Sequence, residues 1–254
     1  MEKQHKVLVI GDAHVEQGQD LRRFKALGKY IKEEQPTHIV NIGDFMSVDA
    51  FSAWDRNKRL LMEGKRYELE CDAANRAMDY IDNAVASVPR YKPTHIDIEG
   101  NHEDRVTRYV EENPELEGTL EVPVKLNLKG RGHVWVPYKS DYDINGVSLT
   151  HVPILGNGKG IGRPNICEKA LKLYHKSVVF GHDHGLYHAM EHRHGAPHLN
   201  QALSAGCFFT DTAHYAIGSK TDYWKGLVML DIYSPNRFDF STIAMSSLLR
   251  KYGR

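Results

Sequence analysis

Hydrophobic and polar positions follow two periods in the first half of this chain. Short apolar runs typical of buried strands cover 6–10, 37–42 and 94–98. Between them, apolar residues recur every three or four positions over 20–34 and 69–85, which is the spacing of an amphipathic helix. Pro36 and Pro89 end these two helices. Strand, helix and strand in this order predict βαβ units with parallel strands.

The second half of the chain is richer in strand patterns. Alternating or continuous apolar runs predict strands over 133–137, 147–150, 177–180, 201–203, 226–233 and 238–244. Asn145-Gly146 is a hairpin turn signal just before the second of these strands. A helix is predicted over 164–176, whereas 111–131 and 152–162 are predicted to be loops because of their Gly and Pro. We expect mainly antiparallel pairing in this half, and a solvated loop over the histidine-rich segment 187–194.

No linker, repeat or low-complexity tract divides the 254 residues. A chain of this length can form one large domain, and we expect a single domain over 1–254 with two packed sheets. Residues 45–65 mix aromatic and basic side chains, among them Trp54 and Arg56. An amphipathic surface element explains that mixture most simply. The alternative is a lid insert that contacts the substrate.

Composition is that of a soluble globular protein. Hydrophobic residues make up 41% and charged residues 26%, and no apolar run approaches the roughly 20 residues of a membrane span. No signal-peptide pattern opens the sequence. Cys71, Cys167 and Cys207 form no Cys-x-x-Cys pair, which argues against a disulfide framework and a thiolate zinc site. We therefore expect a cytoplasmic protein without membrane association.

Charge gives no support for nucleic acid as a partner. The 33 Lys and Arg residues balance the 33 Asp and Glu residues, so the formal net charge is zero. Basic residues within 56–66 are the candidates for a nuclease groove, but acidic residues dilute them. Histidine is the unusual residue type, with 15 copies, and its positions decide whether it carries chemistry.

Five predicted strands end in side chains that can bind a metal ion. These are Asp12 with His14, Asp44, Asn101 with His102, His151, and His182 with His184. Each has an ordinary explanation when taken singly, since Asp after Gly often forms a turn and His often lies in a core. Together they favour one site, because ligands of α/β proteins bind at the carboxyl ends of strands. In each Asp-x-His or His-x-His pair, a period of two can direct both side chains toward that site.

The junction 99–105 joins the predicted strand over 94–98 to a predicted helix over 106–112. Gly100 lets the backbone turn sharply where a larger residue would clash. The turn places an amide oxygen and an imidazole side by side at the end of a strand.

The ligand set without His102 comprises two carboxylates, one amide oxygen and four imidazoles, and it contains no thiolate. This mixture suits borderline divalent ions better than Mg²⁺ or Ca²⁺, and it favours Mn²⁺ with Fe, Zn, Co or Ni as alternatives. Seven groups are too many for one such ion and suit two ions that share a carboxylate. Two ions about 3.5 to 4 Å apart can clamp a phosphoryl group and activate a water molecule.

Five sequence blocks resemble, in order and residue type, the motif series of the calcineurin-like metallophosphoesterase superfamily. They are Gly11-Asp12-Ala13-His14, Gly43-Asp44, Gly100-Asn101-His102-Glu103, His151 and Gly181-His182-Asp183-His184. The resemblance covers about two thirds of the chain. It implies an α/β fold, a four-layer α/β/β/α sandwich of two mixed sheets flanked by helices, with a dinuclear metal site at the strand ends.

The resemblance also implies roles for single residues. Matched by motif, the first metal ion would be held by Asp12, His14 and His184, the second by Asn101, His151 and His182, and Asp44 would bridge the two. His102 would face the phosphate and protonate the leaving oxygen. Arg105 would touch a phosphate oxygen, with a surface salt bridge as the alternative. The implied activity is hydrolysis of a nucleotide or another small phosphoester by metal-activated hydroxide, as a phosphatase or a phosphodiesterase.

Other activities fit the sequence less well. Residues 45–49 lack the Arg that follows the Gly-Asp block in the Ser/Thr phosphatase branch, which argues against a protein phosphatase. His102-Glu103 does not begin a His-Glu-x-x-His motif, since position 106 is Val, and no Gly-x-Ser-x-Gly motif is present. A DNA or RNA nuclease of the same fold and a non-catalytic metal-binding scaffold stay as alternatives. The intact His102 argues against the scaffold, because a scaffold needs no proton donor.

Overall fold

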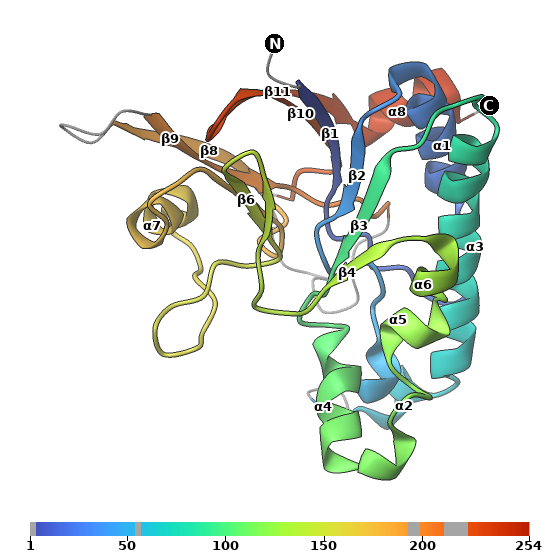
Figure 1. Cartoon of the computed structure of the whole chain (residues 1–254). Helices are drawn as coiled ribbons and strands as arrows, with labels where there is room; N and C mark the ends of the chain where they lie inside the picture. Colours follow the sequence, from blue (N-terminus) through green and yellow to red (C-terminus); the bar gives the residue numbers. More distant parts are fainter. Residues whose placement is uncertain (1–3, 54–56, 193–198, 211–222, 254) are drawn as a thin grey trace.

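Two mixed β-sheets face each other, and helices cover both outer faces (Figure 1). The computed structural model describes residues 4–53, 57–192, 199–210 and 223–253. Trp54 and Arg56 of the predicted lid, and Arg193 and His194 of the histidine-rich segment, lie outside these residues. The α/β/β/α sandwich that the motif resemblance implied is confirmed.

The first sheet combines strands from both ends of the sequence. Its strands are β1 (His5–Ile10), β2 (His38–Asn41), β3 (Thr94–Ile98), β4 (Val134–Val136), β10 (Gly226–Ser234) and β11 (Arg237–Ala244), in the order β11-β10-β1-β2-β3-β4. β1 to β4 run parallel, as the βαβ pattern predicted. β10 pairs antiparallel with β1, with Val9 opposite Val228.

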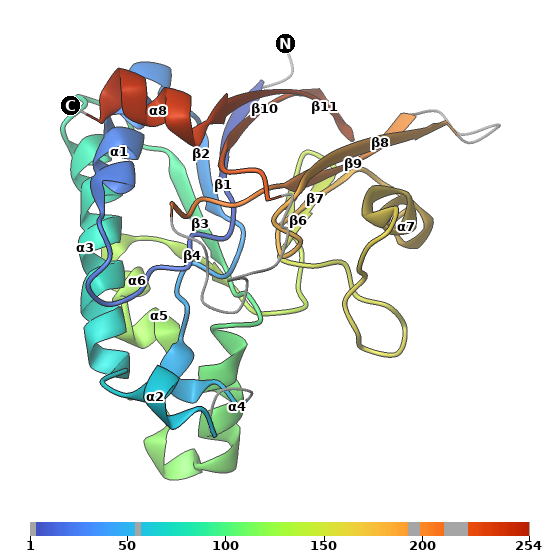
Figure 2. The same ribbon diagram turned by 180° about the vertical axis from the view of Figure 1, so that it is seen from behind.

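Three helices cover the outer face of this sheet (Figure 2). They are α1 (Arg22–Glu34), α3 (Tyr67–Ala86) and α8 (Met245–Tyr252). Helical spacing places Leu27 and Ile31 of α1 and Ala77 and Ile81 of α3 on buried faces, where they share one core. The sequence patterns predicted α1 and α3 but not α8.

The second sheet stacks against the first. Its strands are β5 (Tyr142–Ile144), β6 (Val147–Thr150), β7 (Val178–Phe180), β8 (Leu186–His192) and β9 (Leu199–Ala205), in the order β5-β6-β7-β9-β8. β7 pairs parallel with both β6 and β9, so the expected antiparallel pairing of this half is only partly right. α7 (Ile166–Leu173) covers the outer face of the second sheet.

Both faces of β1 are buried, and its side chains alternate between two cores. Val7 and Val9 enter the core between the sheets, where Leu149 and Val179 of the second sheet meet them. Leu8 and Ile10 face the helices instead. A continuous apolar run is the pattern that such a doubly buried strand requires.

Two predicted loops contain regular structure. Residues 111–131 hold η2 (Pro114–Leu116), α5 (Val122–Lys125) and α6 (Leu128–Arg131), and Pro114 and Pro123 stand in the first turns of the first two. Proline fits there because an N-terminal helical residue needs no N–H donor. The described part of the expected loop over 187–194 is strand β8. Asn145-Gly146 does form a hairpin, but it joins β5 to β6, while β4 belongs to the other sheet.

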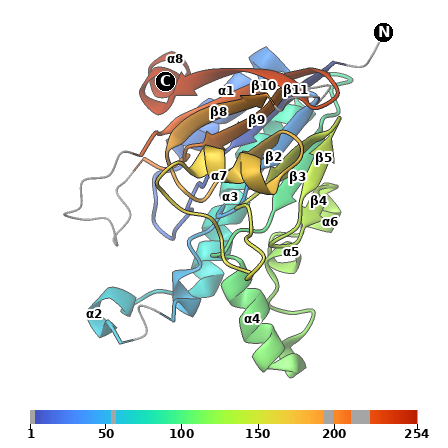
Figure 3. The same ribbon diagram turned by 90° about the vertical axis from the view of Figure 1, so that its left-hand side faces the viewer.

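The insert over 45–65 contains the two short helices η1 (Asp49–Phe51) and α2 (Arg59–Met62). α2 projects away from the body, as does α4 (Asp104–Glu112) (Figure 3). Lys65 anchors the end of the insert through ion pairs with Glu16 at 3.1 Å and Asp49 at 2.7 Å. Within the described ranges, the structure contains no helix that is long and apolar enough to cross a membrane.

Candidate metal centre

The predicted ligands lie in loops at the carboxyl ends of five strands. β1, β2 and β3 of the first sheet and β6 and β7 of the second lead into these loops. Asp12, Asp44, His151 and His184 are buried, although each carries a polar side chain. The site therefore lies where the two sheets meet, and both sheets supply its residues.

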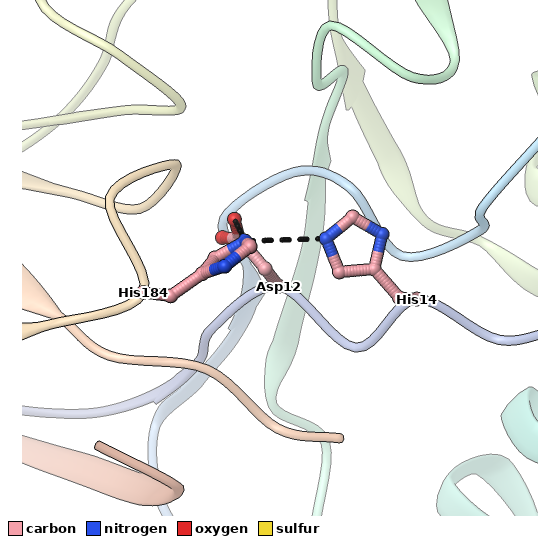
Figure 4. Close-up of side chains that lie close together, drawn as sticks. All are labelled: Asp12, His14 and His184. Atoms are coloured by element: carbon pink, nitrogen blue, oxygen red, sulfur yellow. Dashed lines mark hydrogen bonds and ion pairs between the residues drawn. The ribbon is translucent and has the colours of Figure 1, made fainter. Parts of the chain in front are cut away.

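Asp12, His14 and His184 form the first group of side chains (Figure 4). Nε2 of His14 lies 3.2 Å from Nε2 of His184, and the same His184 atom lies 2.9 Å from Oδ2 of Asp12. One ligand atom from each of the three residues lies within 4.8 Å of the others. A single ion can therefore contact all three.

Asp44, His151 and His182 form the second group. Nε2 of His151 lies 3.4 Å from Oδ2 of Asp44 and 3.0 Å from Oδ1 of Asn101. Asp44 also groups with His14 of the first set, so its carboxylate lies between the two groups. The structure thus brings together all seven side chains proposed as ligands.

The backbone at these residues is not the extended strand that the period-of-two argument assumed. His14, Asp44, His182 and His184 have φ angles of 43°, 49°, 68° and 65°. This left-handed conformation is unfavourable for residues with a Cβ and is common at functional sites. As a result, His182 and His184 belong to different groups, whereas Asp12 and His14 belong to the same one.

Two glycines make room for these side chains. A Cβ on Gly43, which has a φ of 104°, would overlap the His151 ring, and a Cβ on Gly100 would overlap Asp44. The sequence prediction that Gly100 prevents a clash is right in outcome. The cause is the close approach of the Asp44 loop, and not a left-handed turn at Gly100 itself.

The hydrogen bonds of His151 show that the second group requires a positive charge. The Nδ1–H of His151 donates to the carbonyl oxygen of Ile42 at 3.0 Å, so its Nε2 faces the two oxygens of Asp44 and Asn101. A lone pair facing two acceptors is repulsive unless a proton or a metal ion lies between them. Burial lowers the pKa of His151, but the Asp44 and Asp12 carboxylates and the hydrogen bond to Ile42 O together raise it to about 9.

The other ionisable groups of the site favour cation binding in the same way. Burial would raise the pKa of Asp44, yet the imidazoles of His151 and His102 hold it well below its usual range. Burial lowers the pKa of His14 well below its usual value, so its ring is neutral and keeps a lone pair. The ionised carboxylate of Asp44 and the neutral imidazole of His14 together fit a divalent transition metal.

His102 and Arg105 contact each other, and His102 lies beside Asp44 and His14, with its ring centroid 4.6 Å from that of His14. The Nδ1–H of His102 donates to the carbonyl oxygen of Ser47 at 2.6 Å, and Arg105 Nη2 donates to His102 Nε2 at 3.2 Å. Arg105 Nη1 also donates to Ser47 O at 3.0 Å. Among the residues that the structure describes, Arg105 makes no surface salt bridge.

Glu103 is a buried residue of the site whose role was not predicted from the sequence. Its Oε1 accepts from the backbone N–H of Met46 at 2.8 Å, and its Oε2 accepts from those of Asp44 at 3.1 Å and Gly100 at 3.0 Å. Burial raises the pKa of Glu103, while these three donors favour the ionised form. Glu103 therefore joins the loop after β2 to the loop after β3. The only sequence signal for it was its place in the Gly100-Asn101-His102-Glu103 block.

Aromatic rings from the C-terminal part of the chain pack on the first group. The Phe209 ring lies edge to face with His14 and His184, with centroid distances of 5.6 and 5.3 Å, and the Tyr223 centroid lies 4.7 Å from that of His184. No motif marks these two residues in the sequence.

A pocket of about 320 Å³ opens over the site. It is lined by Asp44, Asn101, His102, Ile161, Gly162, His182, Asp183, His184 and Tyr223. Its volume is at the lower end for a small-molecule site. No described residue of the 45–65 insert lines it, and the lid stays a prediction.

Known proteins were compared with this chain. A family model described as calcineurin-like phosphoesterase matches residues 5–186. No curated protein matches the chain. The structure is similar to Vps29 from Chaetomium thermophilum, with 11% identity, a TM-score of 0.46, and coverage of 94% of this chain and 96% of the other. It is also similar to purple acid phosphatase PPD1 from yellow lupin (Lupinus luteus) seeds, with 12% identity and a TM-score of 0.47, covering 97% of this chain and 52% of the other.

Proposed function

Since this chain belongs to the calcineurin-like phosphoesterase family, we propose that it is a metal-dependent hydrolase of small phosphoesters, a phosphatase or a phosphodiesterase. The family supports metal-dependent phosphoester hydrolysis in general. The observation that carries the proposal for this chain is the position of Asp44. Its carboxylate lies between two groups of imidazoles whose nitrogens face acceptors or one another.

The side chains divide naturally between two ions. The first would be held by Asp12, His14 and His184, the second by Asn101, His151 and His182, and Asp44 would contact both. Two divalent ions, Mn²⁺ by preference, would polarise the phosphoryl oxygens and lower the pKa of a water molecule. The hydrogen bond from His151 to Ile42 O fixes which ring nitrogen faces the metal.

His102 is the residue that we assign to the leaving group. Its side chain is 13% exposed and lines the pocket, and its Nδ1–H is held by Ser47 O. Nε2 is therefore the atom that would carry a proton to the leaving oxygen. In the neutral ring Nε2 accepts from Arg105, so we assign Arg105 as the residue that positions the ring. A proton on Nε2 would replace this hydrogen bond and would be directed at the leaving oxygen.

The pocket supports a small substrate over a polynucleotide. Neither Lys nor Arg is among its described lining residues, and its volume of about 320 Å³ suits a nucleotide or a smaller ester. The zero net charge of the chain points the same way.

A hydrolysis panel with added Mn²⁺ tests the proposal. It contains nitrophenyl phosphate, bis-nitrophenyl phosphate, nucleotides, cyclic nucleotides, and single- and double-stranded DNA. We expect turnover of at least one small ester, loss of that turnover with a chelator, and its return with Mn²⁺. Cleavage of DNA alone would show that the protein is a nuclease. If the metal-loaded protein hydrolyses none of these substrates, the non-catalytic metal-binding scaffold is the explanation that stays.

Asp44→Ala should reduce the metal content by more than one equivalent per chain and abolish turnover, because Asp44 would contact both ions. Asp143→Ala is the matched control, since Asp143 is an exposed carboxylate paired with Lys176 at 2.9 Å. Metal analysis of the folded variants decides, and two ions retained by Asp44→Ala would remove Asp44 from the bridge.

A further inference from the structure

A second cluster of histidine and aspartate side chains lies between the first sheet and α3, apart from the proposed catalytic groups. It contains Asp82 of α3, His95 of β3, and His133, which immediately precedes β4. Figure 2 shows α3 alongside these two strands. We propose that these three residues bind a structural divalent cation, zinc by preference. This site does not depend on the proposed function.

The distances between the donor atoms fit a tetrahedral ion. Oδ1 of Asp82 lies 3.1 Å from Nε2 of His133 and 3.7 Å from Nδ1 of His95. Ligands bound to zinc at 2.0–2.1 Å with tetrahedral angles lie about 3.3 to 3.4 Å apart. Shifts of a few tenths of an ångström would therefore complete a His–His–Asp site, with water as the fourth ligand.

The partners of the three residues also match those of metal ligands. The Nδ1–H of His133 donates to Oδ2 of Asp97 at 2.8 Å, which leaves Nε2 directed at Asp82. Arg131 binds Oδ2 of Asp82 and leaves Oδ1 for the ion. A carboxylate behind a ligating histidine, with its own hydrogen bond from Asn41, is the usual support of a protein zinc site.

His95 is a buried residue among the three proposed ligands, and its Nδ1 faces Asp82. It is 7% exposed, and its buried Nε2 has no hydrogen-bond partner among the described residues. Its ring stacks on that of His133 with a centroid distance of 3.8 Å. A proton on His133 shared between Asp82 and Asp97 would explain that ring alone. A cation would bind His95 as well, through Nδ1, the ring nitrogen that lies 3.7 Å from Oδ1 of Asp82.

The charges of the cluster also favour a divalent ion. Asp82 and Asp97 bring two negative charges to this buried region. Arg131 pairs with Asp82 but is shared with the half-exposed Asp79 at 2.8 Å. The side chain of Asp82 is 28% exposed, which gives an ion access from solvent.

The test measures zinc content in the whole chain as a difference between variants. Protein stripped with a chelator is dialysed against buffered free Zn²⁺, and bound zinc is counted. His95→Asn and Asp82→Asn should each hold one equivalent less than the wild type. His188→Asn is the matched control, because His188 is a partly buried histidine of β8 outside both metal groups. It should hold the wild-type amount.

Crystals soaked in Zn²⁺ give the second measurement. An anomalous peak at the zinc edge is expected about 2 Å from Asp82 Oδ1 and from both imidazoles. Equal zinc in the wild type and in folded Asp82→Asn, or no peak at this position, would overturn the proposal and leave a protonated His133. If His95→Asn does not fold, the zinc content of Asp82→Asn decides, because Asp82 is partly exposed and its substitution is better tolerated. Because the zinc count is a difference, inactivity toward phosphoesters would not affect the result.

Discussion

At the scale of single residues, two largely buried side chains of the site, those of Glu103 and His102, have hydrogen-bond partners for all their polar atoms. Glu103 uses both carboxylate oxygens on three backbone donors and thereby holds the Asp44 loop against the Gly100 loop. His102 donates a hydrogen bond from one ring nitrogen to Ser47 O and accepts one from Arg105 at the other. Substitutions of Glu103 and His102 therefore distinguish the support of the loops from the chemical step.

Glu103→Gln should destabilise the fold and weaken metal binding. Whichever way the amide is turned, its NH₂ group faces at least one backbone N–H, and an unmet buried donor costs about 1–3 kcal/mol. Urea unfolding and metal content measure the two effects. Glu112→Gln, at the exposed end of α4, the helix that follows Glu103, is the control and should change neither. A Glu103→Gln protein with wild-type stability would show that the three contacts do not hold the loops.

His102→Ala should keep its metal ions and lose rate according to the leaving group. A general acid contributes about 10² to 10⁴-fold where the leaving oxygen needs a proton. Nitrophenolate needs little help and an alkoxide needs much, so the loss should be small on nitrophenyl esters and large on alkyl phosphates or nucleotides. Equal losses on both kinds of ester would instead show that His102 binds the phosphate.

At the scale of elements, the hydrophobic period predicted the helices and strands whose own sequence shows a clear pattern. Strands β1 and β3 and helices α1 and α3 carry long or doubly buried patterns, and all four formed where expected. β5 and β8 did not stand out, because a three-residue strand and a strand of partly exposed residues show no clear alternation. Their strand character comes from the neighbours β6 and β9, which sequence period does not reveal.

Glu70 connects α3 to the insert and makes that contact sensitive to pH. Its side chain is fully buried, and its Oε1 accepts from the backbone N–H of Asp49 at 3.1 Å. Burial raises the pKa of Glu70 from 4.5 to about 7. The protonated form is therefore favoured by folding, and stability is lost as pH rises from about 4.5 through 7.

Glu70→Gln should remove this loss, since the amide stays neutral. We expect the variant to gain about 2 to 3 kcal/mol over the wild type between pH 4.5 and pH 8. Urea unfolding at both pH values measures the change, and Glu63→Gln, at an exposed position of the insert, is the control. A gap between variant and wild type that does not change with pH would contradict the burial argument.

At the scale of the whole molecule, the first sheet places C-terminal strands beside the N-terminal strand. The motif residues could be predicted from the sequence because each follows a strand end that local pattern reveals. Their division into two groups came from the motif resemblance and not from the local pattern, and the covering by Phe209 and Tyr223 was not predicted at all. Those features arise from left-handed backbone and from contacts between segments far apart in the chain.

A fragment of residues 1–225 should therefore fail to fold, although it contains every proposed ligand. It lacks β10, whose Val228 and Leu230 fill the core between the sheets, and it exposes the edge of β1. Circular dichroism and metal content of the soluble fraction measure the loss. The fragment 1–244, which keeps β10 and β11, is the control and should retain more structure. Metal binding by a cooperatively folded 1–225 would refute this view.

The left-handed backbone at His14, Asp44, His182 and His184 places stability and function in conflict. Each such residue costs about 1 kcal/mol or more, which glycine at the same position would not. Random variants selected only for resistance to heat should therefore collect glycine at these four positions. The same selection would remove the proposed metal ligands first, and it would leave a more stable protein without its activity.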